Sequence, residues 1–267
     1  MDKKKLLIIK LGGSVITDKN KPFTARRSTI FRLGKEIEKA LKKLDAKVII
    51  THGSGSFGHT PAAKYQTHLG NIGKNSIKGL VETANAASTI NEIVMQELKK
   101  TSLNTISFEP RSFIYSNKMR KKNAFLEPIR KALSLDLIPV IYGDVVFDQT
   151  NGFCIYSADR IITILVSGLN SEYKIENIIY CGDTDGVYDC EGKIIPKITP
   201  KNFKKYKKDI SGSKGIDVTG GMLYKVEESL VLATKNKIVT FIINGKKDGI
   251  LKDILEGKKV ESTKIVR

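Results

Sequence analysis

The sequence predicts an α/β fold built on a mainly parallel sheet, and two observations lead to this fold class. Short runs of apolar and β-branched residues, such as 6–10 (LLIIK) and 47–51 (KVIIT), alternate with longer segments of helical periodicity. This alternation is typical of strands that run parallel because a helix connects each strand to the next. The chain has 267 residues, 40% of them apolar, which is enough to bury a sizeable core.

The first half of the chain repeats this alternation with little interruption. In order, it predicts strand 6–10, a helix over about 26–44, strand 47–51, a helix over about 75–100, strand 104–108, a helix near 124–135 and strand 137–143. A hairpin is expected within 145–157 (VVFDQTNGFCIYS), because Asn151-Gly152 stands between two β-favouring segments.

The second half continues the alternation after this hairpin. It predicts a helix over about 158–169, strand 177–181, a polar stretch, a helix over about 219–235, strand 239–243, a short helix and a terminal strand. No linker rich in proline, glycine and serine and no internal repeat divides the chain. We therefore expect one continuous domain over 1–267 with two lobes.

Composition argues against several classes of protein. Nothing approaches the ~18 consecutive apolar residues of a membrane span, and the first apolar run is interrupted at Lys10. We therefore expect a cytoplasmic protein without a membrane partner. Cys154, Cys181 and Cys190 are odd in number and lack CxxC spacing, which predicts neither a disulfide framework nor a zinc site.

The net charge of +18 raises the question of nucleic acid binding. The lysines form short clusters along the whole chain, without RGG-like repeats or an aromatic-basic signature of RNA-binding proteins. We interpret them as a solvated basic surface and expect no specific nucleic acid partner. The positive field would favour an anionic small substrate.

Glycine-rich turns follow the first two predicted strands. Gly12, Gly13 and Ser14 come after the first strand, and Gly53, Gly55 and Gly58 come after the second. Open α/β sheets bind ligands at the carboxyl ends of their strands, and glycine lets backbone N–H groups approach an anion. A tight turn would explain either loop alone, but two such loops indicate one or two phosphorylated ligands.

Two common phosphate-binding motifs do not explain these turns. Gly53-x-Gly55-x-x-Gly58 matches GxGxxG, but no strand and no acidic residue follow in 70–80 to hold a ribose. The P-loop pattern GxxxxGK[ST] is absent from the sequence. A nicotinamide oxidoreductase and a P-loop NTPase are therefore disfavoured.

Three lysines suggest phosphoryl transfer instead, because that reaction needs cations around the migrating group. Lys10 ends a strand before glycines, Lys19 lies in ITDK, and Lys225 lies in DVTGGMLYK. With 46 Lys and Arg residues, surface charge is a sufficient explanation for Lys19 or Lys225 alone. It explains Lys10 less well, since a charge ending an apolar strand rarely serves solubility alone.

Five motifs in order, KLGGS, HGSGSFGH, PVIYGDVV, GDTDGVY and DVTGGMLYK, resemble the amino acid kinase superfamily over almost the whole chain. HGSGSFGH, DVTGGMLYK and the ending GKKVESTKI resemble the isopentenyl phosphate kinases within it. The resemblance implies a three-layer αβα fold, with the acceptor in a lobe over about 1–170 and ATP in a lobe over about 171–267. It also implies Mg-ATP as phosphoryl donor, isopentenyl phosphate as acceptor, isopentenyl diphosphate as product, and a homodimer.

Matching positions then imply site residues. The ATP side would comprise Lys10, Gly12, Gly13, Ser14, Gly55, Asp183, Gly221 and Lys225. The acceptor side would comprise Gly53, Ser54, Gly58, His59 and Ala158. The catalytic residues would be Lys10, Lys19, Lys225, Asp159, which orients the lysines, and His59, which would bond the acceptor phosphate. No protein ligand for a metal is predicted.

Two positions depart from the family pattern, since Ser54 stands within the usual HGGG and Ala158 replaces the glycine of Gly-Asp-Asp. The other two histidines have ordinary interpretations: His52 as a local hydrogen-bonding residue, His68 as a surface or helix-end residue. Asp144, Asp185 and Asp189 are expected in loops after strands, as caps or turns. A kinase of another small phosphate or phosphonate such as fosfomycin, and a non-catalytic nucleotide sensor or nucleic acid binder, remain alternative functions.

Overall fold

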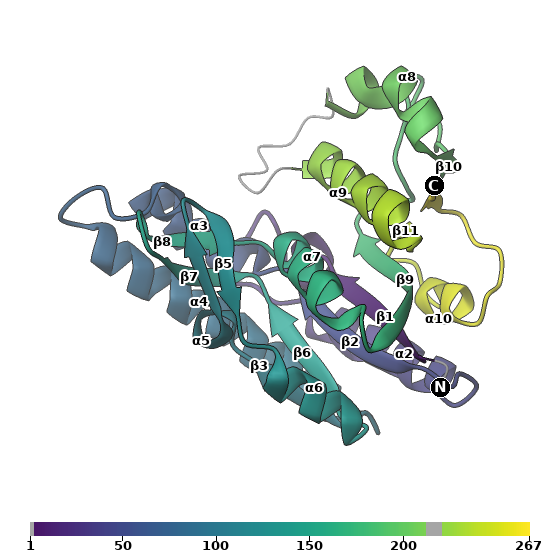
Figure 1. Cartoon of the computed structure of the whole chain (residues 1–267), viewed down its shortest axis with the longest axis horizontal. Coiled ribbons are helices and arrows are strands. Elements are labelled where there is room, and N and C mark those ends of the chain that lie inside the picture. Colours follow the sequence, from purple (N-terminus) through teal and green to yellow (C-terminus); the bar gives the residue numbers. More distant parts are fainter. Residues whose placement is uncertain (1–2, 212–220) are drawn as a thin grey trace.

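The computed structural model describes residues 3–211 and 221–267 and has an eight-stranded sheet at its centre (Figure 1). Its strands, in spatial order, are β10 (Lys197–Ile198), β12 (Thr263–Ile265), β11 (Val239–Asn244), β9 (Tyr173–Gly182), β1 (Lys4–Leu11), β2 (Lys47–His52), β6 (Ile138–Tyr142) and β3 (Thr105–Phe108). β12 runs antiparallel to β11, and the other described pairings in this sheet are parallel. The predicted mainly parallel sheet is confirmed.

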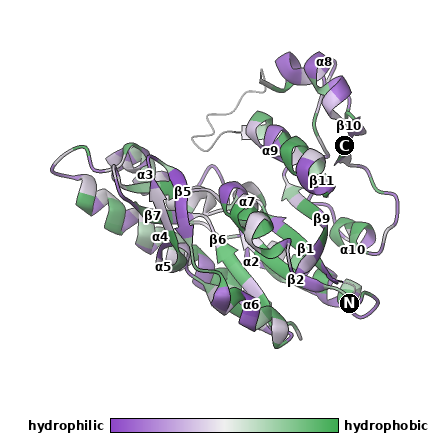
Figure 2. Ribbon diagram, viewed as in Figure 1, coloured by the Kyte–Doolittle hydropathy of each residue, from purple (hydrophilic) through white to green (hydrophobic). Residues whose placement is uncertain are grey.

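Helices cover both faces of this sheet. Successive residues of a strand point to opposite sides, so each face packs against its own layer of helices. Leu7 and Ile9 of β1 pack in a core with α2, α4 and α10, whereas Leu6 and Ile8 pack in a core with α6, α7 and α9. These helices are α2 (Arg27–Leu41), α4 (Ser76–Leu98), α10 (Ile250–Leu255), α6 (Glu127–Ser134), α7 (Ala158–Leu169) and α9 (Gly221–Asn236). Figure 2 shows the apolar residues concentrated on the central strands. The αβα layering is therefore as predicted.

A second sheet of four strands lies beside α4, at the end of the molecule away from α8 (Pro200–Ser211) (Figure 1). It has the order β5-β4-β7-β8, with β5 (Arg120–Ala124), β4 (Ile114–Asn117), β7 (Asp144–Asp148) and β8 (Gly152–Tyr156). β7 and β8 pair antiparallel, with Asp148 opposite Gly152 and residues 149–151 between the strands, so the predicted hairpin is confirmed. Gly152 has a φ of +74°, which suits a turn glycine.

Several elements differ from the sequence prediction. The helix expected near 124–135 begins at Glu127, because the residues before it form β4 and β5. The expected polar stretch contains α8, and the second glycine-rich loop continues into α3 (Gly55–Tyr65). The short elements α1 (Gly13–Ile16), α5 (Pro110–Phe113) and η1 (Thr67–Leu69) were not predicted either. The helix expected from 219 is described from Gly221, and its first two predicted positions lie outside the described residues.

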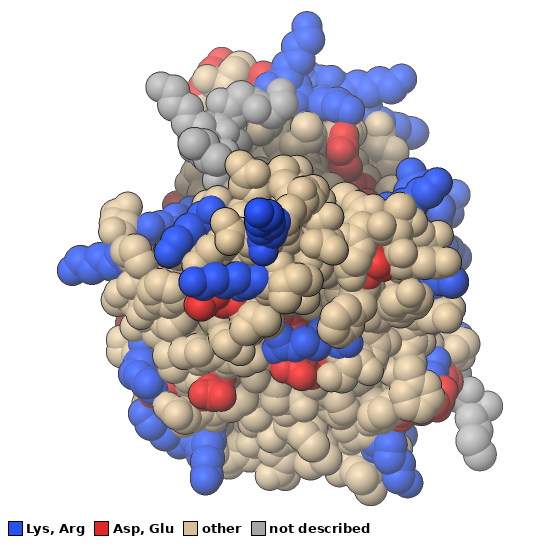
Figure 3. Space-filling model, turned by 90° about the vertical axis from the view of Figure 1, so that its left-hand side faces the viewer, with Lys and Arg blue, Asp and Glu red and all other residues tan. Residues whose placement is uncertain are grey.

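Basic side chains are spread over the face seen in Figure 3 and are dense at its top, where lysine-rich α8 lies. Among the described helices, none is both long and apolar enough to cross a membrane. The division of the domain into an acceptor lobe and an ATP lobe stays a prediction.

Candidate active site

The two predicted glycine-rich turns lie against each other at the carboxyl edge of the central sheet. β1 and β2 are parallel neighbours, with Leu11 opposite His52, so the turns that follow them emerge side by side. The Gly53 N–H donates to the Leu11 carbonyl at 3.1 Å. A Cβ built on Gly13 would lie only 2.7 Å from the Gly55 Cα. A Cβ built on Gly53 would lie 3.0 Å from the Gly13 backbone N, which is also too close. The backbones therefore touch because their side chains are absent.

Other glycines of the site are required by space or by backbone conformation. A Cβ on Gly12 would lie 2.6 Å from the Cys181 carbonyl oxygen, which already accepts the Gly12 N–H at 2.8 Å. Gly55 has a φ of +51°, a conformation that residues with a Cβ rarely adopt. Gly58 leaves room for the Ser54 side chain, whose Oγ would lie 2.3 Å from a Cβ there.

Three helices begin at this edge of the sheet. α1 starts at Gly13, α3 at Gly55 and α7 at Ala158, whose preceding Ser157 accepts the Arg160 N–H at 3.4 Å. Helix N-termini present unpaired N–H groups and a partial positive charge, which favours anions. Ala158 is buried at the start of α7. A Cβ added to Gly143 would lie 3.2 Å from the Ala158 backbone N, so the absence of a side chain at Gly143 lets the two segments approach closely.

A buried ion pair lies beside these turns. Lys10 Nζ contacts both carboxylate oxygens of Asp159 at 2.6 Å, and each residue is only 9% exposed. Lys10 comes from the end of β1, and Asp159 comes from the first turn of α7, 149 residues later. Burying either charge alone would be costly, so each holds the other in place.

Tyr180 brings a second lysine to this pair. Lys10 Nζ and Lys225 Nζ each lie 5.5 Å from the centroid of the Tyr180 ring, which sits opposite Lys10 on β9. Burial raises the pKa of the Tyr180 hydroxyl well above its usual value, so the ring stays neutral and attracts both cations through its face. The structure thus brings together three predicted site residues, Lys10, Asp159 and Lys225. Tyr180, whose ring both lysines face, was not among the predicted residues.

Lys19 belongs to a second, more exposed charge pair. Its Nζ lies 3.0 Å from Asp183, just after β9, and its side chain is 64% exposed. Burial acts to raise the pKa of Asp183, but hydrogen bonds from Lys19 and Ser14 outweigh it and hold that pKa below its usual value. Water screens such a pair, which contributes only about 0–1 kcal/mol to stability. Lys19 and Ser14 thus share a carboxylate at the edge of the Gly12–Gly13 turn.

His59 lies on the exposed side of α3, one turn after Gly55 and next to Gly58. The structure therefore places it on α3, in the glycine-rich segment that begins at Gly53 after β2. Gly221, at the first described residue of α9, has a φ of +59° and lies one turn before Lys225. The roles of these residues toward ligands stay predictions.

The remaining histidines and two of the aspartates behave as expected. Buried His52 contacts the Gly53 carbonyl at 3.2 Å and Asn91 at 3.1 Å, and burial lowers its pKa. His68 is half-buried in η1. Asp189 accepts the N–H groups of two following residues at 2.9 Å, and Asp185, earlier in the same loop, pairs with Lys247 of the loop after β11.

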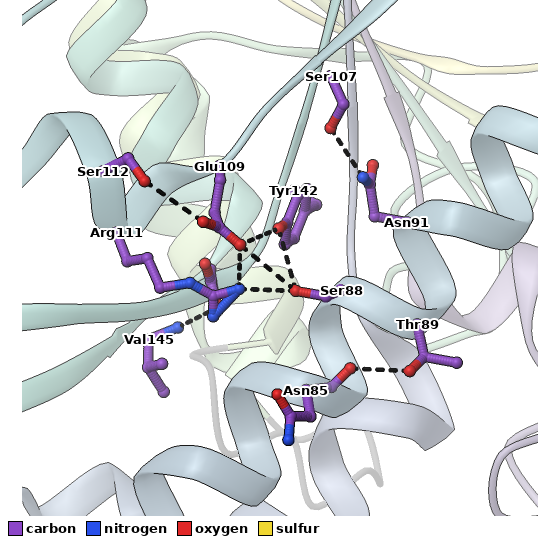
Figure 4. A network of polar contacts seen from close by, with 11 residues as sticks. Asn85, Ser88, Thr89, Asn91, Ser107, Glu109, Arg111, Ser112, Tyr142 and Val145 are labelled. Atoms are coloured by element: carbon purple, nitrogen blue, oxygen red, sulfur yellow. Dashed lines mark hydrogen bonds and ion pairs between the residues drawn. The ribbon is translucent and has the colours of Figure 1, made fainter.

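Asp144 differs from its prediction as a loop residue. It is the first residue of β7, is 2% exposed and lies 3.4 Å from Arg111, whose contacts with Glu109 and Ser88 are drawn in Figure 4. Burial raises its pKa to about 7 despite Arg111. Among the described atoms, its Oδ2 has no hydrogen-bond partner. Asp144 is buried because α4 and α5 pack against β7, an arrangement that the local sequence does not reveal.

Across residues 3–211 and 221–267, no three histidine, cysteine, aspartate or glutamate side chains are arranged to hold a metal ion. Asp159 and Asp183, two carboxylates at this edge of the sheet, each pair with a lysine. A divalent cation at this edge would therefore need oxygen ligands from a bound phosphate.

Comparison with known proteins agrees with this geometry. The model of the Amino acid kinase family matches residues 5–244. The isopentenyl phosphate kinase of Methanocaldococcus jannaschii is 36% identical, over 97% of this chain and 98% of that protein. The isopentenyl phosphate kinase of Methanothermobacter thermautotrophicus is 32% identical, over 97% and 98%. A solved isopentenyl phosphate kinase superposes with a TM-score of 0.81 and 29% identity, over 98% of this chain and all of that one. This chain therefore belongs to the amino acid kinase family and, within it, to the isopentenyl phosphate kinases.

Proposed function

We propose that this protein transfers the γ-phosphoryl group of ATP to isopentenyl phosphate, giving isopentenyl diphosphate and ADP. The observation that carries the proposal is the buried Lys10–Asp159 pair beside two glycine turns whose backbones touch. Touching turns would hold two phosphates close together, and the pair would place a fixed positive charge next to them.

On the ATP side, the backbone N–H groups of Gly12, Gly13 and Ser14 would bind the nucleotide phosphates. Gly55, Gly221 and Asp183 would lie on the same side. Lys10 and Lys225, which face one tyrosine ring, would stabilise charge on the migrating phosphoryl group. Asp159 would keep Lys10 in place, and Lys19 would approach the same group from its exposed pair with Asp183.

On the acceptor side, Gly53, Ser54 and Gly58 would receive the acceptor phosphate near the start of α3, with Ala158 at the start of α7. His59 would donate a hydrogen bond to this phosphate. A phosphate monoester has its second pKa near ~6, so its oxygen is already a nucleophile at neutral pH. No general base is needed, and His59 would act as donor and charge stabiliser.

The donor set fits a magnesium ion that arrives with the nucleotide. Both nearby carboxylates are paired with lysines, so the phosphate oxygens of ATP and water would supply most ligands, as is usual for Mg²⁺. When bound, the ion would neutralise charge on the β- and γ-phosphates.

We also propose that the protein works as a cytoplasmic homodimer. Ile77 and Val81 lie one turn apart on α4 and are about half exposed, as expected for residues that a second copy covers. The three cysteines are free thiols, which suits a reducing compartment. Light scattering at several protein concentrations tests the dimer.

A coupled assay of ADP release tests the function. The acceptors are isopentenyl phosphate, dimethylallyl phosphate, fosfomycin, UMP, glutamate and carbamate, each with Mg-ATP, and Lys10→Ala is the control for contaminating kinases. We expect the highest kcat/KM with isopentenyl phosphate. A higher value with fosfomycin or UMP would assign the protein to another phosphate acceptor, and ATP binding without turnover of any acceptor would indicate a sensor.

A further inference from the structure

Thr17 joins the two glycine-rich turns through a single hydroxyl group. It directly follows α1 and is fully buried. Its Oγ1 donates to the Gly13 carbonyl at 2.7 Å and accepts the Ser56 N–H at 3.1 Å. One side chain therefore connects the turn after β1 with the start of α3.

The bond to Ser56 supplies what α3 lacks locally. Ser54, at the N-cap position of α3, makes no side-chain capping hydrogen bond. The first N–H groups of a helix need acceptors from outside the helix. Thr17 provides one of them from a segment 39 residues away. The start of α3, which carries the predicted acceptor residues, is thus fixed relative to the Gly12–Gly13 turn.

The packing around this hydroxyl is close. A Cβ on Gly55 would lie 2.1 Å from Thr17 Oγ1 and 2.9 Å from its methyl group. Gly55 and Thr17 therefore fit together only because Gly55 has no side chain. A small change at Thr17 would alter the contact between the two turns rather than either turn alone.

Thr17 also begins the segment that carries Lys19. Its own N–H donates to the Gly13 carbonyl at 2.9 Å, and it forms an antiparallel bridge with Ala25. Two residues later, Lys19 pairs with Asp183. Three parts of the candidate site therefore meet at one residue.

We propose that Thr17 is a positioning residue that sets the distance between the donor phosphate on the Gly12–Gly13 turn and the acceptor phosphate at the start of α3. This inference rests on the proposed phosphoryl transfer. In-line transfer requires the reacting atoms to approach within about 3–3.5 Å, and a misplacement of about 1 Å can cost about 100-fold in rate. Binding of each substrate alone depends mainly on its own turn. Loss of the hydroxyl should therefore lower kcat far more than either affinity.

Thr17→Val, which removes the hydroxyl at nearly constant shape, is compared with Thr17→Ser, which keeps it. Thr101→Val is the matched control, because Thr101 Oγ1 also donates to a carbonyl (Leu98, 2.6 Å) and accepts an N–H (Leu103, 3.2 Å). It lies before β3, at the opposite edge of the parallel sheet. Measurements are kcat, the Kd of ATP and of isopentenyl phosphate each alone, thermal unfolding and hydrogen exchange of the Ser56 N–H.

We expect Thr17→Val to lower kcat by about 10- to 100-fold with each Kd within about threefold of wild type, and Thr17→Ser to restore kcat. Among these variants, the Ser56 N–H should exchange faster only in Thr17→Val.

If Thr17→Val keeps wild-type kcat, or Thr17→Ser is equally impaired, the proposal is wrong. If Thr17→Val does not fold, Thr17→Ser becomes the test. A normal kcat in Thr17→Ser supports the positioning role of the hydroxyl, whereas a loss of kcat in the folded Thr17→Ser variant contradicts that role. A wild type inactive on isopentenyl phosphate would refute the proposed function, and hydrogen exchange would still test the Thr17 link.

Discussion

Two carboxylates, Asp159 and Glu36, are both buried next to a helix N-terminus, but their partners differ. Asp159 in α7 is bonded to the side chain of Lys10. Glu36 in α2 accepts backbone N–H groups at the start of α10, from Gly249 and Leu251 at 3.0 Å and Lys252 at 3.2 Å. Arg32 pairs with Glu36 and donates to the Gly245 and Lys247 carbonyls.

The difference lies in what each carboxylate holds, backbone groups in one case and a charged side chain in the other. The oxygens of Glu36 are bonded to backbone groups that cannot move without unfolding α10. Asp159 instead holds a lysine that ends beside two turns with bare backbone. We infer that the Glu36 cluster serves stability and that the Lys10–Asp159 pair serves phosphoryl transfer.

The largest expected effect is on catalysis. Lys10→Ala should lower kcat by roughly 100- to 1000-fold, because it removes one pre-organised charge that stabilises the transition state. Lys10→Arg should rescue poorly, since a planar guanidinium does not replace a compact ammonium group. Steady-state kinetics measures the loss, and circular dichroism checks the fold. A near-native kcat in Lys10→Ala would remove Lys10 from the chemistry.

The matching change in the other cluster should affect stability. Glu36→Gln should lower the free energy of unfolding by about 3 kcal/mol, because Arg32 and the α10 N–H groups lose their charged acceptor. Urea denaturation measures this change, and kcat should stay within about threefold of wild type. If kcat falls while stability is unchanged, the two clusters do not differ as we infer.

A third buried carboxylate, Asp144, extends the comparison because its bonding is incomplete. Burial raises its pKa to about 7, whereas an unfolded aspartate titrates near ~3.9. Its stabilising contribution is therefore present at low pH and is lost as the pH rises through 7, because the folded chain must ionise a buried carboxyl. Between pH 5 and 7.5 the free energy of unfolding should fall by about 2 kcal/mol through this group.

Asp144→Asn should remove that part of the pH dependence. Urea denaturation of both proteins from pH 5 to 7.5 isolates the contribution of Asp144, because all other titrating groups are shared. Parallel stability curves for the two proteins would show that Asp144 is already ionised at pH 5.

The smallest expected effect concerns His59. His59→Ala should lower kcat/KM for isopentenyl phosphate by about tenfold, the loss of one hydrogen bond to a charged group, and His59→Gln should retain much more activity because its amide can donate. ATP binding should be unchanged in both variants. Equal loss in Gln and Ala, with both folded, would argue against the donor role.

The sequence identified the parts of this molecule that depend on local pattern. The parallel strands, the hairpin at Asn151-Gly152 and both glycine-rich turns could be predicted, because alternation and turn chemistry are local. Tyr180 and Asp144 could not, since a tyrosine inside an apolar strand and an aspartate after a glycine look ordinary until distant segments enclose them. Thr17 could not be predicted as a positioning residue either, because its partner Ser56 lies 39 residues away in the sequence.

The central claim is that the charged centre at the ends of β1 and α7 transfers phosphoryl from ATP to the phosphate of isopentenyl phosphate. Phosphorus NMR of the reaction mixture tests it most directly, with Lys10→Ala as control. We predict that wild type yields ADP and a two-phosphorus product with mutually split resonances in equal amounts, only when isopentenyl phosphate is present. ADP and inorganic phosphate in equal amounts, regardless of the acceptor, would contradict the account.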